Sequence, residues 1–377
     1  MTRTILLAGG GTAGHVFPAV AVAHELRELA DVEPVFVGVD DRLEARLVPE
    51  AGFRLHHIEA VSIPRRPSPA LLKVPGALRA GVQACLALIE QERAVAAVTF
   101  GGYVSFPLDR ASWRAQLPLV IHEQNSIPGL TNRIAARWAD RVAVTFPGSA
   151  DRVRRPERCA VTGNPVRSDV LALDRPARRA EARTGFGLDP DLPTLLVFGG
   201  SQGARRLNRA IVGAHTLWGD TRLQILHAAG RGGHEESASG WEQARAAGTG
   251  PHVVLVDFIE DMADAYAASD VVVCRAGATS IAELTVLGLP SVLVPYPHAT
   301  ADHQTENARA LERTGGAIVI EDDRLQADQL VAAVRPLLDD AARYADMARA
   351  SVAFGRRDAA TNVARLVLGL LEPEART

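Results

Sequence analysis

Short apolar runs alternate along this chain with longer segments in which apolar residues recur at helical spacing. The short runs are rich in Val, Ile and Leu, which predicts strands buried on both faces. The longer segments predict helices that cover those strands. Strands and helices in alternation are typical of a parallel sheet with helices on both faces, so the expected fold class is α/β.

The first half of the chain has five predicted strands and three predicted helices. The strands are Thr4–Ala8, Pro34–Val39, Ala96–Thr99, Leu119–Ile121 and Arg141–Val144. The helices are Pro18–Leu29, Leu71–Gln91 and Leu130–Trp138. A turn-rich stretch, Thr162–Pro165, then ends this half.

The same plan restarts after the turn. The strands predicted there are Leu195–Phe198, Leu223–His227, Val253–Val256, Val271–Cys274, Ser291–Val294 and Ala317–Ile320. The helices are Ala204–Leu217, Asp261–Ala268, Ser280–Leu287 and His303–Arg313, and the pattern is helical after Gln326. With 377 residues, the chain is long enough for two doubly wound domains of similar size.

Each half opens with an apolar strand, a glycine-rich loop and a helix: TILLAGGGTAGH in the first half and TLLVFGGSQGA in the second. Glycines let the backbone turn sharply and approach a ligand. The helix that follows offers free N–H groups and the positive end of its dipole. Both loops are therefore candidate phosphate sites, in a cleft where the carboxyl ends of the strands of the two domains meet.

Two other interpretations of these loops are weaker. Gly9, Gly11 and Gly14 match the dinucleotide fingerprint GxGxxG, with Asp40 as a ribose ligand. A dehydrogenase would leave His15 and the second glycine loop without a role.

The second loop also matches the hydrolase motif GxSxG. Its residues are Gly199, Ser201 and Gly203, with Asp257 and His298 or His303 following in the order of a catalytic triad. A hydrolase would leave the first domain unused. A Ser201 hydroxyl that donates to a phosphate oxygen is the better interpretation.

Composition excludes several classes of protein. The net charge of −3 provides no basic field for nucleic acid. The three cysteines have no CxxC spacing, which favours buried thiols in a reducing compartment. No apolar run approaches the ~20 residues of a membrane span, and the N-terminal run is too short for a signal peptide. We expect a cytoplasmic or peripheral protein.

Seven segments in order carry a resemblance to a known family. They are GGGTAGHVFPAVAVA, TFGGYVSFP, IHEQNSIPGLTNR, GNPVR, FGGSQGARRLN, CRAGATSIAELTVLGLPSVLVPYPHATADHQTENA and the helical tail. Together they resemble the MurG family, which transfers N-acetylglucosamine (GlcNAc) from UDP-GlcNAc to lipid I. Two positions depart from the family pattern: Ala13 replaces a glycine of GGTGGH, and Ser280 replaces a threonine.

The resemblance implies a GT-B fold, with two Rossmann-like doubly wound domains facing across a cleft. Residues 1–164 and a C-terminal helix within about 355–377 would form the acceptor and membrane-side domain, and residues 165–354 would bind UDP-GlcNAc. Transfer to the MurNAc 4-hydroxyl would be inverting, would form lipid II for peptidoglycan synthesis, and would need neither metal nor cofactor. The enzyme would be peripheral, at the cytoplasmic face of the membrane, where a cell-wall synthesis complex could include it.

The resemblance also assigns roles to individual residues. His15 is the candidate general base, because imidazole titrates near neutral pH, although a binding role without proton transfer stays open. The expected UDP-GlcNAc-binding residues are Thr12, Ala13, Gly14, Asn125, Arg167, Ser201, Ile259, Ala278, Thr279, Ser280, Glu283 and Gln304. For Glu283 we expect contact with the ribose hydroxyls.

Other hypotheses stay open at this point. The segment Val61–Arg79 mixes apolar and basic residues and, with Trp113, could contact anionic lipid. His298, Asp302 and His303 could suggest a metal, but their spacing has no defensible ligand geometry. The alternatives in function are a paralogous transferase with another lipid-linked or antibiotic-pathway acceptor, a 2-epimerase, and a nucleotide-sugar-binding or dinucleotide-binding protein without transferase activity.

Overall fold

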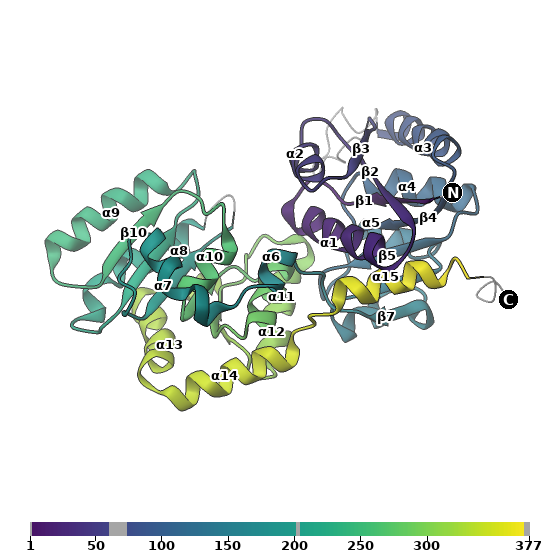
Figure 1. Cartoon of the computed structure of the whole chain (residues 1–377). Helices are drawn as coiled ribbons and strands as arrows, with labels where there is room; N and C mark the ends of the chain where they lie inside the picture. Colours follow the sequence, from purple (N-terminus) through teal and green to yellow (C-terminus); the bar gives the residue numbers. More distant parts are fainter. Residues whose placement is uncertain (1, 60–73, 201–203, 373–377) are drawn as a thin grey trace. The chain divides into compact units, whose positions relative to one another are not determined.

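The computed structural model describes residues 2–59, 74–200 and 204–372 (Figure 1). The chain forms two compact units. Unit 1 comprises residues 1–167 and 356–377, and unit 2 comprises residues 168–355. The sequence placed the first boundary after Asn164, close to the observed one after Arg167.

Unit 1 is built on a parallel seven-stranded sheet with strand order β3-β2-β1-β4-β5-β6-β7. Its strands are β1 (Arg3–Ala8), β2 (Val32–Gly38), β3 (Arg54–His57), β4 (Ala94–Thr99), β5 (Leu119–Glu123), β6 (Arg141–Val144) and β7 (Cys159–Val161). The order reverses at β1, because β2 lies on one side of it and β4 on the other. Loops that leave the carboxyl ends of the central strands diverge at such a point and leave room for a ligand.

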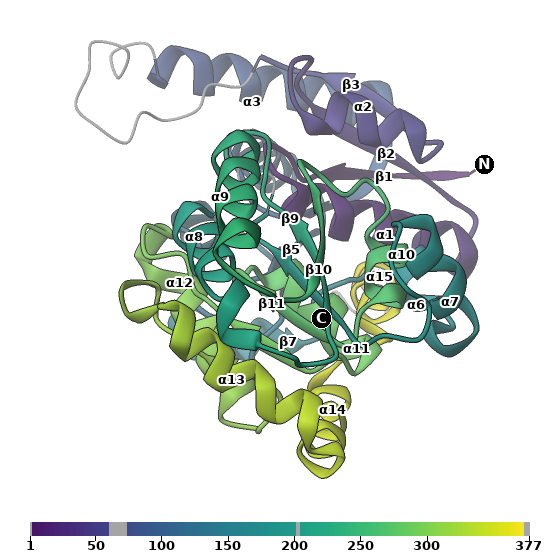
Figure 2. The same ribbon diagram turned by 90° about the vertical axis from the view of Figure 1, so that its left-hand side faces the viewer.

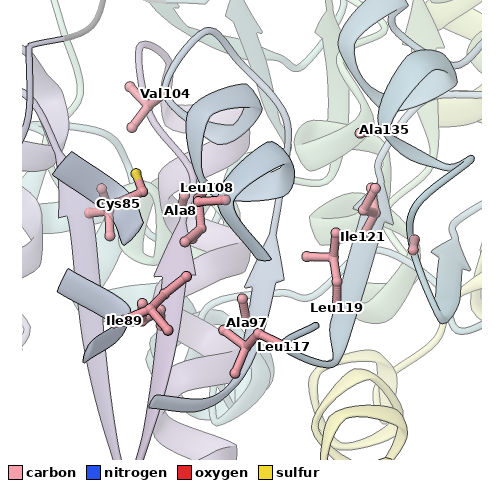
Figure 3. Close-up of a cluster of buried hydrophobic side chains, with 14 of the residues drawn as sticks. Ala8, Cys85, Ile89, Ala97, Val104, Leu108, Leu117, Leu119, Ile121 and Ala135 are labelled. Atoms are coloured by element: carbon pink, nitrogen blue, oxygen red, sulfur yellow. The ribbon is translucent and has the colours of Figure 1, made fainter. Parts of the chain in front are cut away.

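Helices cover both faces of this sheet. They are α1 (Ala13–Leu29), α2 (Leu43–Glu50), α3 (Val74–Gln91), α4 (Ser105–Arg114), α5 (Leu130–Ala135), the 3-10 helices η2 (Pro147–Arg152) and η3 (Pro156–Arg158), and α15 (Ala359–Gly369). One face packs against α1 and α15. The other packs against α3, α4 and α5, where Cys85, Leu108 and Ile121 belong to one buried apolar cluster (Figure 3).

Unit 2 repeats the plan with a parallel six-stranded sheet of order β10-β9-β8-β11-β12-β13. Its strands are β8 (Thr194–Phe198), β9 (Gln224–Ala228), β10 (His252–Val256), β11 (Val271–Cys274), β12 (Ser291–Leu293) and β13 (Ile318–Val319). The order again reverses at the first strand of the unit, so the glycine loop after β8 lies at the switch point.

The helices of unit 2 also form two layers; in Figure 2, α8 and α9 lie on one side of the sheet and α7 and α10 on the other. They are α6 (Ser168–Leu171), α7 (Arg175–Gly185), α8 (Arg205–Gly213), α9 (His234–Ala247), α10 (Met262–Ala268), α11 (Ala278–Leu287), α12 (His303–Glu312), α13 (Ala327–Asp339) and α14 (Ala341–Phe354). The 3-10 helices are η4 (His215–Trp218), η5 (Thr300–Asp302) and η6 (Asp322–Arg324). No helix within the described ranges combines the length and the apolar character needed to cross a bilayer.

All the predicted strands are present, with ends displaced by a residue or two. The pattern missed the edge strands β3 and β7. Both are partly exposed; β3 consists mostly of charged and polar residues, and β7 has only 3 residues. The pattern also misplaced the start of α1, which begins at Ala13 and not at Pro18. Pro18 lies in the second turn of α1, where a proline cannot donate the helical hydrogen bond to the carbonyl of Gly14.

A buried polar network joins the sheet of unit 2 to its helices. His227 on β9 is fully buried, and its Nδ1 accepts a hydrogen bond from the Trp241 indole at 3.1 Å. Its Nε2 lies 3.2 Å from Asn208 Oδ1 and therefore carries the proton. Burial lowers the pKa of His227 to about 3, with His234 a smaller cause. The imidazole is therefore neutral in the folded protein at neutral pH.

Because His227 is buried in its neutral form, we expect the folded protein to lose stability in acid. The unfolded chain binds the proton near pH 6.5 and the folded chain near pH 3, so His227 contributes stability above about pH 6.5 that is lost as the pH falls toward 3. Between about pH 7.5 and about pH 5 we expect it to account for a loss of about 2 kcal/mol. Urea unfolding at both pH values should show a weaker pH dependence for His227→Gln than for the wild type. His252→Gln, at an exposed position on β10, is the matched control, and equal pH dependence in all three proteins would contradict the prediction.

Candidate active site

The carboxyl ends of β1, β4 and β5 form one connected edge in unit 1. Phe100 N–H donates to the carbonyl of Ala8 at 2.7 Å, which joins the loop after β4 to the end of β1. The Ser105 hydroxyl, which is buried, lies 3.1 Å from the same carbonyl and 2.7 Å from that of Gly101. Gln124, after β5, donates to the carbonyl of Phe100 at 2.7 Å. The three loops therefore hold one another in place.

The first glycine loop leads directly into α1. Thr12 is the extended residue before the helix, and its carbonyl accepts from the N–H groups of His15 and Val16. His15, half-buried in the first helical turn, places Nδ1 3.1 Å from the carbonyl oxygen of Gly10 and 3.1 Å from Thr12 Oγ1. Ala13 and Gly14 share this turn. The contacts of Nδ1 thus hold the imidazole at the loop.

The loop after β4 packs closely on the first one. Gly101–Gly102 has positive φ angles of +83° and +87°, which favour glycine. A Cβ on Gly102 would also lie 2.7 Å from the carbonyl oxygen of Gly10 and 3.4 Å from His15 Nδ1. The Tyr103 ring lies against Gly11. Burial, together with the charge of Glu44, raises the pKa of Tyr103.

A buried carboxylate shapes the loop after β5. Glu123 accepts hydrogen bonds from the N–H groups of Asn125 and Gly129 at 2.9 and 3.0 Å. The same carboxylate also accepts hydrogen bonds from the side-chain amides of Asn132, at 2.9 Å, and Asn125, at 3.4 Å. Burial raises the pKa of Glu123, and these hydrogen bonds oppose the shift. Glu123 therefore fixes the conformation of Asn125, one of the predicted site residues.

The neighbouring histidine connects β5 to the turn that ends the first part of unit 1. His122 Nε2 lies 3.0 Å from the carbonyl oxygen of Gly163 and donates to it. Burial lowers the pKa of His122 to about 4, so the imidazole is neutral at neutral pH. Gly163 has a φ of +86°, and a Cβ there would lie 2.5 Å from Arg356 Cβ. A glycine is therefore needed where the chain returns to unit 1.

Arg167 is the last residue of the first part of unit 1. The resemblance implies a UDP-GlcNAc-binding role for it. Its guanidinium lies over the ring of Phe17, 4.8 Å from the ring centroid. Phe17 lies in the second turn of α1, so Arg167 packs on the helix that carries His15.

In unit 2 the loop after β8 begins with Gly199–Gly200, and Ser201 lies outside the described residues. An ionic network stands at the same edge of the sheet. Arg275, directly after β11, contacts Asp322 Oδ1 at 2.6 Å and donates to the carbonyls of Val294 and Pro295. Arg206, in the first turn of α8, lies 3.4 Å from the other carboxylate oxygen of Asp322. This network joins the ends of β11, β12 and β13 to α8.

The helix α11 presents the next group of predicted residues. Ala278, Thr279 and Ser280 form its first turn after the extended residue Gly277. Glu283 lies one turn further on and is buried. Its Oε2 accepts a hydrogen bond at 2.8 Å from the hydroxyl of Tyr266, which is fully buried on α10. Tyr266 thereby fixes the orientation of the Glu283 carboxylate.

The remaining predicted residues of unit 2 lie after β10 and β12. Ile259 is buried, whereas its neighbour Phe258 is exposed and lies under the guanidinium of Arg231. Gln304, in the first turn of α12, accepts a hydrogen bond from the N–H of Tyr296 at 2.9 Å. Among the residues that the structure describes, His, Cys, Asp and Glu side chains do not gather into a group that could hold a metal ion.

The predicted residues thus fall into two sets, each at the carboxyl edge of one sheet. Unit 1 holds Thr12, Ala13, Gly14, His15, Asn125 and Arg167, and unit 2 holds Ile259, Ala278, Thr279, Ser280, Glu283 and Gln304. Sequence reasoning missed Glu44, Tyr103, Tyr266 and Asp322. For Glu44 a signal existed, since it lies four residues before the buried Val48 and therefore on the same face of α2.

Comparison with known families first defines the class of protein. Residues 5–144 match the glycosyltransferase family 28 N-terminal domain, and residues 194–363 match the glycosyltransferase family 28 C-terminal domain. The two parallel α/β units and these matches define a two-domain glycosyltransferase of the GT-B fold.

Relatives that match over nearly the full length of the chain identify its family within this class of glycosyltransferases. The chain is 48% identical to a UDP-N-acetylglucosamine–N-acetylmuramyl-(pentapeptide) pyrophosphoryl-undecaprenol N-acetylglucosamine transferase of Nocardioides sp., over 97% of this chain and 98% of the relative. It is 42% identical to the Streptomyces coelicolor protein of the same name, over 99% of both chains. The crystal structure of Acinetobacter baumannii MurG is similar, with a TM-score of 0.75, 26% identity, and coverage of 97% of this chain and 99% of that one. The chain belongs to the MurG family of N-acetylglucosamine transferases.

Proposed function

We propose that this protein transfers GlcNAc from UDP-GlcNAc to the MurNAc 4-hydroxyl of lipid I, with inversion at the anomeric carbon, and so forms lipid II for peptidoglycan synthesis. The observation that carries the proposal is the 48% identity to a transferase of that name over 97% of the chain. The glycine loop at the switch point of unit 2 supports it, because such loops suit pyrophosphate groups.

The chemistry requires a base for the acceptor hydroxyl and stabilisation of the departing UDP. His15 is the proposed base, because Nδ1 contacts the Gly10 carbonyl and therefore carries the proton, so the basic lone pair resides on Nε2. Unit 1 would bind the acceptor and unit 2 the nucleotide. The proposed contacts to UDP-GlcNAc are Thr12, Ala13, Gly14, Asn125, Arg167, Ser201, Ile259, Ala278, Thr279, Ser280, Glu283 and Gln304.

Incubation with radiolabelled UDP-GlcNAc and a lipid I analogue tests the reaction. We expect label in a product whose mass equals the acceptor plus one GlcNAc, with UDP released in equal amount. An acceptor that lacks the MurNAc 4-hydroxyl is the control and should stay unlabelled. Turnover of UDP-GlcNAc without any acceptor, or transfer only to a different lipid-linked acceptor, would refute the proposal.

Glu283 is the proposed ribose ligand. A carboxylate accepts hydrogen bonds from hydroxyl groups, and those to a charged acceptor are worth roughly 1.5–3 kcal/mol. The Tyr266 hydroxyl already donates to Oε2, so the carboxylate is oriented before the donor binds. Its burial shelters these hydrogen bonds from water.

We expect Glu283→Ala to weaken UDP and UDP-GlcNAc binding alike, by roughly 10-fold to 100-fold, because both ligands carry the ribose. The wild type should bind the 2′-deoxy donor less tightly than UDP-GlcNAc, and the variant should bind both donors about equally. Calorimetry with UDP and the two donors measures these affinities. Glu260→Ala, at an exposed position before α10, is the control. Normal UDP affinity in Glu283→Ala would exclude the ribose contact.

We propose further that unit 1 docks on the anionic cytoplasmic face of the membrane. Most of the segment expected to do so, residues 60–73, lies outside the described residues, but the helix α3 that follows it packs on α4. On α4, Trp113 is 49% exposed and lies under the guanidinium of Arg110 at 4.1 Å. Trp138 lies 5.3 Å from the same guanidinium. We call Arg110, Trp113 and Trp138 the tryptophan patch. Aromatic rings beside arginines are suited to a lipid headgroup region.

Replacing Arg110 and Arg114 with Ser should weaken binding to anionic vesicles by roughly 30-fold, because each basic residue near such a surface contributes about 1 kcal/mol. Turnover of a short-chain soluble acceptor should stay unchanged. Cosedimentation with phosphatidylglycerol-containing vesicles measures the binding. The double variant Arg349→Ser and Val352→Ser on α14 removes an exposed basic and apolar pair elsewhere and should bind like the wild type. Equal binding by all three proteins would remove the tryptophan patch from the proposal.

A further inference from the structure

A buried carboxylate lies beneath the first glycine loop of unit 1. Glu44, on α2, is 1% exposed, although a charged side chain is rarely buried without a partner. Its Oε2 accepts a hydrogen bond from the N–H of Gly11 at 3.0 Å. The two residues are 33 positions apart in the sequence, so the tertiary fold creates this contact. Burying a carboxylate is costly, so the burial of Glu44 calls for an explanation.

Glycines make the space for this carboxylate. A Cβ on Gly10 would lie 2.4 Å from Glu44 Oε1, and a Cβ on Gly38 would lie 2.8 Å from Glu44 Cγ. Gly38 ends β2, and Gly10 follows β1. Glu44 therefore occupies a socket between the ends of two adjacent strands, and any larger residue at either glycine would displace it.

The peptide group between Gly10 and Gly11 is held at both ends. Its N–H, on Gly11, donates to the Glu44 carboxylate, and its carbonyl oxygen, on Gly10, lies 3.1 Å from His15 Nδ1. A carbonyl can only accept, so in this hydrogen bond Nδ1 carries the proton and the lone pair resides on Nε2. A peptide that donates to a carboxylate becomes more polarised, and its carbonyl becomes a better acceptor.

We propose that Glu44 is the positioning residue of the catalytic base, and that it acts on His15 through the Gly10–Gly11 peptide group. Glu44 orients this peptide, and the peptide selects the Nδ1-protonated tautomer of His15. Nε2 then carries the lone pair that takes the proton of the acceptor hydroxyl, and the Glu44 charge stabilises the imidazolium that results. The inference rests on the proposed function, in which His15 is the base.

Other groups around His15 contribute to its electrostatics. His122, on β5, interacts with His15 and is itself neutral at neutral pH. Tyr103 lies beside Glu44 and is influenced by Asp41 and Arg42, which precede α2. Thr12 Oγ1 lies 3.1 Å from His15 Nδ1. Among these groups, Glu44 alone combines burial, negative charge and a direct bond to the peptide that His15 contacts.

A double-mutant cycle in the full-length enzyme tests the proposal. Glu44→Ala should lower kcat by about 10-fold to 100-fold, the range typical of partners that orient a functional histidine, with the KM for UDP-GlcNAc within about 2-fold of wild type. His15→Ala should lower kcat by about 10²–10⁴-fold. The variant with both changes should be no slower than His15→Ala, because Glu44 acts only through His15. Losses that multiply in the double variant would refute the proposal.

Glu44→Gln removes the charge of the side chain but keeps its shape. It replaces Glu44→Ala in the double-mutant cycle if the alanine variant does not fold. Its amide oxygen can still accept from Gly11 N–H, but the negative charge is gone. The acid limb of the kcat/KM profile should move to lower pH, because the imidazolium loses a stabilising charge. Glu50→Ala, at the exposed end of the same helix, is the control and should match the wild type. An acid limb unchanged in Glu44→Gln would refute the electrostatic part of the proposal.

A readout independent of activity is the ¹⁵N spectrum of the imidazole of His15, assigned by its absence in His15→Gln. We expect a protonated Nδ1 in the wild type and a mixture of tautomers in Glu44→Ala. The same tautomer in both proteins would show that Glu44 does not select it. If the wild type itself transfers no GlcNAc to lipid I, the proposed function fails. If the wild type is active but the kcat losses of Glu44→Ala and His15→Ala multiply in the double variant, only the role of Glu44 is refuted.

Discussion

Parallel pairing of strands that are buried on both faces is the constraint on which both units depend. Such strands cannot be joined by tight turns, so each must be followed by a loop and a helix that cross over the sheet. All carboxyl ends then lie along one edge, and the reversal of strand order at β1 and at β8 opens that edge at the two glycine loops. The positions of Gly9–Gly11 and Gly199–Gly200 follow from this topology before any ligand is considered.

Buried polar groups then determine the conformations of the loops. Glu44 holds the peptide after Gly10, Glu123 holds the loop that carries Asn125, and the Asp322–Arg275 pair joins the loops of unit 2. Each of these charges would be costly without partners. Glu123 and Asp322 have several partners in the loops, whereas Glu44 has one through Oε2 and its Oε1 is buried without a hydrogen bond. Loops that would otherwise be free to move are therefore organised in advance of the substrate, which lowers the entropic cost of binding.

The burial of Glu44 under the first glycine loop distinguishes this loop from a simple anion site. The sequence suggested that its N–H groups would hold a phosphate, as such loops often do. In the structure, the N–H of Gly11 already donates to Glu44. The loop therefore carries a negative charge beneath it, which suits the task of orienting an imidazole and stabilising its protonated form. The acceptor pyrophosphate would depend on other donors.

The sequence by itself determined the elements whose signal is local. Apolar runs such as Leu195–Phe198 predicted the central strands, because a strand buried on both faces must be apolar throughout. Ordered motifs identified the family, and they placed His15, Asn125 and Glu283 at loops or helix starts, although the roles of these residues stay predictions. The edge strand β3 escaped notice because a partly exposed strand needs no continuous apolar run, and β7 because its 3 residues are too few to give a signal.

Only the tertiary structure decided which polar side chains are buried and what they contact. Glu44 stands in the charged stretch Asp40–Glu50, where nothing local distinguishes it from its solvent-exposed neighbours except its spacing from Val48. Likewise, Tyr266 and Glu283 meet across two helices, 17 positions apart in the sequence. Hydrophobic periodicity is a property of neighbouring residues, whereas a hydrogen bond between distant residues depends on how strands and helices pack, and that packing is set by the whole chain.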